Sequence, residues 1–175
     1  MTHSTHEAQA TLRSQYKANP AQAMVTDRAS TRSSTKVADP FHSLVIPKGG
    51  DNPAWPVGVH SAVGGPYDAP CPGDLLCAAL AACQDSSIRL VAANMGIELT
   101  ALDVHVQGKV DVRGALGVQK DVPVGFQSIT CDVHLQAKDG TPPEMLEKLR
   151  MAAERCCVVL STLQSPPQVQ TNYHM

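Results

Sequence analysis

Cys83 and Cys157 are the residues of this sequence whose type and setting best suit chemistry. Each lies in an apolar segment with helical spacing, LCAALAACQDSSI and AAERCCVVLSTL respectively. If the two helices pack together, their thiols can meet, and a sulfenic acid formed on one can be converted to a disulfide by the other. Such a pair needs a Cα separation of about 4.4–6.8 Å. The alternative is inert packing, because free cysteine is among the most buried residue types.

The remaining candidates for chemistry are interpreted as structural. Cys71, Cys77 and Cys131 fit packing positions, and Cys71 falls at a predicted helix N-cap. The six cysteines contain no C-x-x-C, so metal spacing is absent. His105 and His134 fall on the polar faces of neighbouring predicted strands, but two histidines without a third ligand make a poor metal site. No cofactor and no metal are therefore expected.

Length and composition indicate one globular domain, residues 1–175. Apolar residues make up 43% of the chain and charged residues 17%, which suits a packed core. A net charge of −2 without a basic run gives no reason to expect a nucleic-acid partner. The first twenty residues are polar, unlike a signal peptide, and the longest apolar run is about half of a bilayer span. We expect a cytoplasmic protein without a membrane partner, in which cysteines are mostly reduced.

Residues 1–60 are predicted to form a strand-rich N-terminal arm. Alternation of apolar and polar residues from Ala10 to Tyr16 gives a weak strand signal. The polar stretch 29–36 is typical of a loop or a sheet edge, and 39–56 is interrupted by proline and glycine.

The clearest element is a helix that opens at Pro72 and ends before Gly96. Proline suits the first helical position, Asp74 suits the positive end of the helix dipole, and glycine suits the C-terminal cap. Its first half is apolar all round, which predicts a buried central helix. Two strands follow, over about 102–113 and 124–137, because apolar residues recur with period two. An antiparallel pair is the simplest connection.

A second helix is predicted from the capping-box spacing of Thr141 and Glu144. Pro166 and Pro167 end it, and a final strand is expected over 169–173. Strands, helix, strands, helix and strand in this order define an α+β domain. The inward stripe of the second helix consists of Leu146, Leu149, Ala153, Cys157 and Leu160.

The segment GGPYDAPCPGDLLCAALAAC, residues 64–83, resembles the hallmark of the OsmC family of osmotically inducible and organic hydroperoxide resistance proteins. In that family a glycine-rich turn and a proline open the long central helix, and the first reactive cysteine follows. The strand pair and the segment CVVLSTL from Cys157 are also similar to the family pattern. The resemblance covers about residues 64–169.

The resemblance implies an α+β OsmC-like fold, with an antiparallel sheet around two central helices in an intertwined homodimer. It further implies a thiol-dependent peroxidase for organic hydroperoxides, with Cys83 as the attacking thiol and Cys157 as the resolving one. A small thiol or a lipoylated protein would be the reductant. The alternative is a non-peroxidase dimer that binds a small apolar ligand or a thiol metabolite at the subunit interface. One residue of slip in the alignment would make Cys156 the resolving thiol.

The sequence departs from the family pattern at Gly73. Hydroperoxide-resistance members carry a glutamate just after the helix-opening proline, paired with an arginine from the N-terminal strands. Here Asp74 comes one residue later and is interpreted as a partner of the helix dipole. Arg28 and Arg32 are candidates for the arginine, and ordinary surface positions are the alternative for both. Without such a cation, Cys83 has no evident source of activation.

Overall fold

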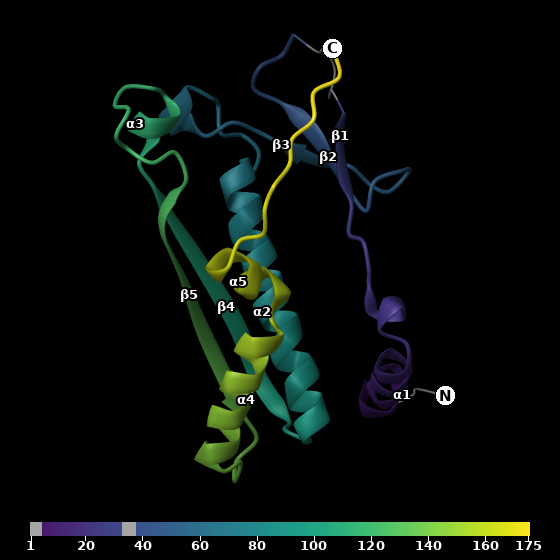
Figure 1. The fold of residues 1–175 in the computed structure, drawn as a ribbon. Coiled ribbons are helices and arrows are strands. Elements are labelled where there is room, and N and C mark those ends of the chain that lie inside the picture. The colour runs from purple at the N-terminus through teal and green to yellow at the C-terminus, as the bar shows by residue number, and fades with distance from the viewer. Residues whose placement is uncertain (1–4, 33–37) are drawn as a thin grey trace. The chain divides into compact units, whose positions relative to one another are not determined.

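The chain forms two compact units, residues 1–78 with 107–130 and residues 79–106 with 131–175. The computed structural model describes residues 5–32 and 38–175 (Figure 1). Of the stretch 29–36, predicted as a loop or a sheet edge, residues 29–32 form a strand at the edge of a sheet and the rest lies outside the described residues. The elements are α1 (Thr5–Ala18), η1 (Pro20–Ala23), β1 (Ala29–Arg32), β2 (Ser43–Pro47), β3 (Trp55–Val57), η2 (Ser61–Val63), α2 (Pro72–Met95), β4 (Leu99–Val110), α3 (Val112–Ala115), β5 (Phe126–Ala137), α4 (Pro143–Cys156) and α5 (Val158–Gln164).

The N-terminal arm is not uniformly strand-rich, because it begins with a helix. The predicted strand over Ala10–Tyr16 is wrong: these residues lie inside α1. The segment is rich in strong helix formers, and no residue of α1 is buried, so local propensity outweighs a weak alternation. The rest of the arm does contain strands. β1, β2 and β3 form an antiparallel sheet in which Ala29 pairs with Pro47 and Ser43 pairs with Val57.

Helix α2 begins and ends where the sequence predicts. Near its start, the Asp74 carboxylate accepts a 2.8 Å hydrogen bond from the Cys71 N–H. At its end, Gly96 has a φ of 69°, a left-handed conformation that glycine adopts without steric cost. The N–H of Ile97 then bonds to the Ala92 carbonyl at 2.9 Å, and Ile97 is buried, which completes the expected hydrophobic cap.

Among the described residues, α2 is the helix that is long and apolar enough to cross a membrane by length and composition. The longest apolar run alone therefore underestimated the apolar length of this helix. The central helix of a soluble protein passes the same test, and the buried residues of α2 fall between Leu80 and Ala92. Its all-apolar beginning is only partly covered in this single chain, so the predicted burial of the first half is less complete than expected.

The strands β4 and β5 pair to form a long two-stranded sheet (Figure 1). In the second unit, the Lys138 N–H bonds to the Glu98 carbonyl at 2.9 Å. In the first unit, Gly108 lies against the ring of Phe126. Residue numbers therefore rise along one strand as they fall along the other, which defines the predicted antiparallel hairpin.

The second predicted helix is present but divided. α4 ends at Cys156, Cys157 has an extended conformation with φ −76° and ψ 103°, and α5 follows. The predicted capping box is absent, because the helix starts at Pro143 and Thr141 lies one position too early to be its N-cap. The final strand over 169–173 is also absent: this segment is exposed and contains no strand.

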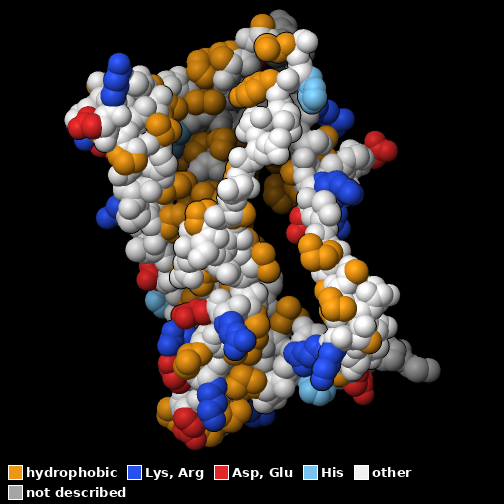
Figure 2. Space-filling view, in the orientation of Figure 1, with side chains coloured by type: hydrophobic (Ala, Val, Ile, Leu, Met, Phe, Trp, Pro, Cys, Tyr) orange, Lys and Arg blue, Asp and Glu red, His pale blue; other side chains and the backbone are white. Residues whose placement is uncertain are grey.

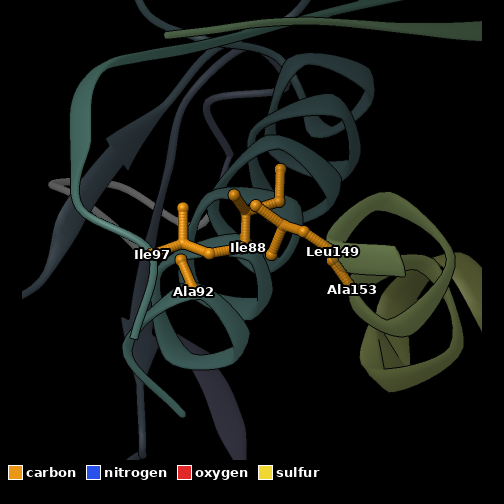
Figure 3. Packing of buried hydrophobic residues seen from close by; sticks show 5 residues of the cluster. All are labelled: Ile88, Ala92, Ile97, Leu149 and Ala153. Atoms are coloured by element: carbon orange, nitrogen blue, oxygen red, sulfur yellow. The ribbon is translucent and has the colours of Figure 1, made fainter. Parts of the chain in front are cut away.

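The core of the second unit lies between the second half of α2 and α4. Figure 3 shows Ile88 of α2 beside Leu149 of α4, and Ala92 beside Ile97. Leu149 is 0% exposed, and full burial of a leucine side chain contributes about 1.5–3 kcal/mol. On the outer side, α4 carries charged residues of both signs (Figure 2). This amphipathic packing holds α4, and the residues that follow it, against α2.

Candidate active site

The structure brings the thiols of Cys83 and Cys157 together. The Cys83 side chain lies close enough to the Cys157 thiol to raise its pKa. Cys83 is half-buried within α2, whereas Cys157 is 0% exposed at the junction of α4 and α5. The arrangement can support disulfide formation, because a sulfenic acid on one sulfur would have the other thiol beside it.

The local fold explains why Cys157 reaches Cys83. Leu149, Ala153 and Cys157 are each buried, and their spacing of four residues places them on one face of the helix that contacts α2. Cys157 continues this stripe by one further turn. Because the helix breaks there, the Cys157 Sγ accepts a hydrogen bond from the Leu160 N–H at 3.4 Å and serves as the N-cap of α5.

The surroundings of Cys157 favour its protonated form. Burial raises the pKa of this thiol above its usual value, and the nearby Cys83 side chain raises it further. The N–H groups of Leu160 and Val159 oppose this shift but do not outweigh it. Cys157 is therefore a thiol at neutral pH, and it must release a proton when it forms a disulfide.

The other cysteines occupy different settings. Cys131 is half-buried on β5, and burial, assisted by the neighbouring Asp132, raises the pKa of its thiol. Cys71 and Cys77 are half-buried. Cys156, the last residue of α4, is exposed although it is adjacent to the buried Cys157.

Two adjoining cavities lie in the second unit, between α2, β5 and α4. The first, about 380 Å³ in volume, has an apolar lining that includes Ile88, Leu135 and Leu146. Both cavities are lined by Gln84, Cys131, Arg150 and Glu154. Gln84 is only 5% exposed, which is low for an amide side chain.

Sequence reasoning missed Gln84 and Arg150. A signal for Gln84 was present, since it is a polar residue directly after Cys83 in an apolar helix. Arg150 lines both cavities, but its Nε bonds to Glu147 at 3.0 Å and one of its terminal nitrogens bonds to Glu154 at 2.8 Å. These carboxylates neutralise its charge.

Gly73 lies close to other side chains. A Cβ placed on it would lie 3.4 Å from the Phe126 ring and 3.5 Å from the Cys71 sulfur, both ordinary contacts. Asp74, one residue after Gly73, interacts with the residues around the start of α2. Its carboxylate accepts hydrogen bonds from the Cys71 N–H and, at 3.2 Å, from the Tyr67 hydroxyl.

The candidate arginines and histidines have exposed positions. Arg28 precedes β1 and Arg32 ends it, and both side chains are exposed. His105 and His134 do approach each other, with ring centroids 5.7 Å apart, and both are exposed as predicted. Within residues 5–32 and 38–175, no group of three His, Cys, Asp or Glu side chains is arranged to hold a metal ion.

Comparison with known proteins defines the class of protein. The model of the family described as OsmC-like protein matches residues 64–172, and the chain therefore belongs to this family. Its fold is the α+β OsmC-like fold. No match was found among curated protein sequences.

Solved structures agree with this assignment. An OsmC-like protein from Mycoplasma pneumoniae is 15% identical, with a TM-score of 0.63 over 81% of this chain and 89% of that chain. An OsmC-like protein of unknown function from Vibrio cholerae is 13% identical, with a TM-score of 0.64 over 79% and 94%. An organic hydroperoxide resistance protein from Legionella pneumophila is 20% identical, with a TM-score of 0.59 over 81% and 91%. At these identities the likeness concerns the fold alone.

Proposed function

We propose that this protein is a thiol-dependent peroxidase that reduces organic hydroperoxides in defence against oxidative stress. The proximity of the Cys83 thiol to the buried Cys157 thiol is the observation that carries the proposal. Membership of a family that includes organic hydroperoxide resistance proteins supports the substrate class.

In the proposed cycle, Cys83 and Cys157 are the catalytic residues. The Cys83 thiolate attacks the distal peroxide oxygen, the O–O bond breaks, Cys83 becomes a sulfenic acid, and the substrate leaves as an alkoxide that takes up a proton from solvent to become an alcohol. Cys157 then attacks the sulfenic acid sulfur of Cys83, the S–O bond breaks, and water leaves. The proton of the Cys157 thiol accompanies the departing oxygen. A small thiol or a lipoylated protein finally reduces the disulfide.

Oligomeric state and location complete the proposal. A cytoplasmic homodimer is favoured by the family and by the partly covered apolar start of α2, which a second subunit could bury. We further propose that residues 1–175 act as one OsmC-like domain, with 64–175 as its core and 1–60 as an N-terminal arm. Neither a membrane nor nucleic acid is a proposed partner.

The decisive experiment counts thiols before and after about one equivalent of cumene hydroperoxide. Wild type and the matched control Cys77→Ser should each lose a pair of thiols to a Cys83–Cys157 disulfide, identified by peptide mass. Cys83→Ser and Cys157→Ser should form no such link. Survival of every thiol in the wild type would exclude the peroxidase.

The 380 Å³ cavity favours a second candidate function. Its apolar lining and the buried amide of Gln84 suit a small apolar ligand with one hydrogen-bonding group. Under this alternative the protein is a non-peroxidase dimer that binds such a ligand or a thiol metabolite. Saturable binding of cumyl alcohol that Gln84→Leu weakens, together with no loss of thiols to the hydroperoxide, would favour it.

A further inference from the structure

The adjacent cysteines Cys156 and Cys157 differ in exposure, and the proposed cycle gives Cys156 no role. Cys157 is 0% exposed, so no external reductant can reach its sulfur directly. Cys156 is exposed, although only one peptide bond separates the two residues. An exposed thiol is thus tethered beside the buried sulfur of the proposed disulfide.

The backbone changes conformation at this pair. Cys156 ends α4, and Cys157 has extended φ and ψ angles before α5 begins. In a continuous helix, successive side chains point about 100° apart. Because the helix ends between these cysteines, helical geometry does not fix the angle between their side chains.

We propose that Cys156 is a relay thiol that carries oxidation from the buried Cys83–Cys157 disulfide to the protein surface. The inference rests on the proposed function, which supplies that disulfide. The Cys156 thiolate attacks the Cys157 sulfur, the Cys83–Cys157 bond breaks, and Cys83 leaves as a thiolate that takes up a proton. This exchange forms a Cys156–Cys157 disulfide without net oxidation or reduction.

An external dithiol completes the relay. One of its thiolates attacks the exposed Cys156 sulfur and releases Cys157, which takes up a proton. Its second thiol then displaces Cys156, so the external dithiol becomes a disulfide and both cysteines become thiols. A disulfide between adjacent residues is strained, because their Cα atoms lie about 3.8 Å apart against the usual 4.4–6.8 Å. Strain and exposure both make a disulfide easier to reduce.

The sequence allows each disulfide to be assigned by trypsin digestion. Cleavage after Arg155 yields the peptide 156–175, whose only cysteines are the vicinal pair. Cys83 lies in the peptide 49–89 together with Cys71 and Cys77, so fragmentation of the linked peptides by tandem mass spectrometry identifies the bonded cysteine. A Cys83–Cys157 bond therefore links two peptides, whereas a Cys156–Cys157 bond leaves one peptide lighter by the mass of two hydrogen atoms.

The test uses diamide, which oxidises thiols without peroxide, on full-length wild type, Cys156→Ser, Cys83→Ser and the control Cys77→Ser. Oxidised Cys83→Ser should contain the vicinal disulfide. When reduced thioredoxin serves as the external dithiol, oxidised Cys156→Ser should regain its thiols about tenfold more slowly than wild type and Cys77→Ser.

The outcomes separate the relay from the peroxidase proposal. Recovery of Cys156→Ser at the wild-type rate overturns the relay, even if the Cys83–Cys157 disulfide forms normally. Absence of a vicinal disulfide in oxidised Cys83→Ser also overturns it. If wild type forms no Cys83–Cys157 link with either diamide or cumene hydroperoxide, the proposed function fails and the relay fails with it.

Discussion

The Cys157 thiol lies beside the thiol of Cys83, and its sulfur accepts a hydrogen bond from the Leu160 N–H. These contacts and the burial of Cys157 give the two cysteines different settings, since Cys83 is only half-buried. In the proposed cycle, the more accessible sulfur reacts with the peroxide and the buried sulfur then reacts with the sulfenic acid. This asymmetry matches the proposed roles of attacking and resolving thiol.

Cys157 should resist alkylation far more than its neighbour. Its pKa is raised and its side chain is fully buried, and alkylation needs an accessible thiolate. Native protein treated with iodoacetamide at about pH 8 should yield the peptide 156–175 with one alkyl group, on Cys156. In urea both cysteines should react at similar rates. Equal rates in the native protein would contradict the structure.

Gly73 and Gly108 both face Phe126 but should respond oppositely to alanine. A Cβ on Gly108 would lie 2.3 Å from Cε1 of Phe126, whereas a Cβ on Gly73 would lie 3.4 Å from its Cζ. We expect Gly108→Ala to lower the free energy of unfolding by about 1–3 kcal/mol. We expect Gly73→Ala to be neutral or to raise it by up to about 1 kcal/mol, because alanine favours helix.

A double-mutant cycle with Phe126 is the control for the effect of Gly108→Ala. Urea unfolding of Gly108→Ala in a Phe126→Ala background should show a smaller cost, because the clashing ring is gone. An unchanged cost would mean that Gly108 is required for some reason other than the ring.

His42 should make stability depend on pH. Its Nδ1 lies 2.9 Å from Asp39 and its Nε2 lies 3.1 Å from Asp68, and these hydrogen bonds raise the pKa of the imidazole. Because the folded pKa exceeds the unfolded one, the stabilisation is fully present below about pH 6.5 and is lost as pH rises through the folded pKa. The stability difference between wild type and His42→Gln should therefore shrink from about pH 6 to about pH 9.

Urea titrations of both proteins across this range provide the measurement. A difference that stays constant with pH would show that His42 contributes packing or neutral hydrogen bonds only. A matched variant, Asp68→Asn, should reduce the same pH dependence, because it removes one of the carboxylates that stabilise the charged ring.

Local chemistry explains which parts of the fold could be predicted. The ends of α2 follow from Pro72, Asp74 and Gly96, since capping depends on residues within a few positions. The break at Cys157 could not be predicted, because the apolar stripe continues to Leu160 and cysteine is not a usual N-cap. The predicted strand at 169–173 has suitable alternation but no neighbouring strand to pair with in the described structure.

The candidate site was predictable only in part. A stripe of period 3.6 places Cys157 on the inner face of its helix, but whether its sulfur meets Cys83 depends on tertiary packing. The cavity residues Gln84 and Arg150 come from separate helices and share no sequence motif. Residue type and spacing therefore point to the two candidate thiols but not to the residues that surround them.

The role of Asp74 gives a final prediction, which tests whether it caps α2 or replaces the missing glutamate. Burial opposes ionisation of its carboxyl, but the Cys71 N–H, the Cys71 thiol and the Tyr67 hydroxyl outweigh it and lower the pKa. Asp74→Ala should lower the free energy of unfolding by about 1 kcal/mol at neutral pH, the typical cost of a lost cap. Because the pKa is depressed, this difference should vanish as pH falls through the folded pKa, below about 3.9.

The two roles differ in what happens to the cysteines. As a cap, Asp74 can be removed without preventing the Cys83–Cys157 disulfide, so Asp74→Ala should still lose a pair of thiols to cumene hydroperoxide while its unfolding midpoint in urea falls. Gly73→Ala is the matched control, one residue away in the same turn. If Asp74→Ala keeps wild-type stability yet no longer forms the disulfide, the carboxylate acts on the chemistry, and its hydrogen bonds to Cys71 and Tyr67 orient it for that purpose.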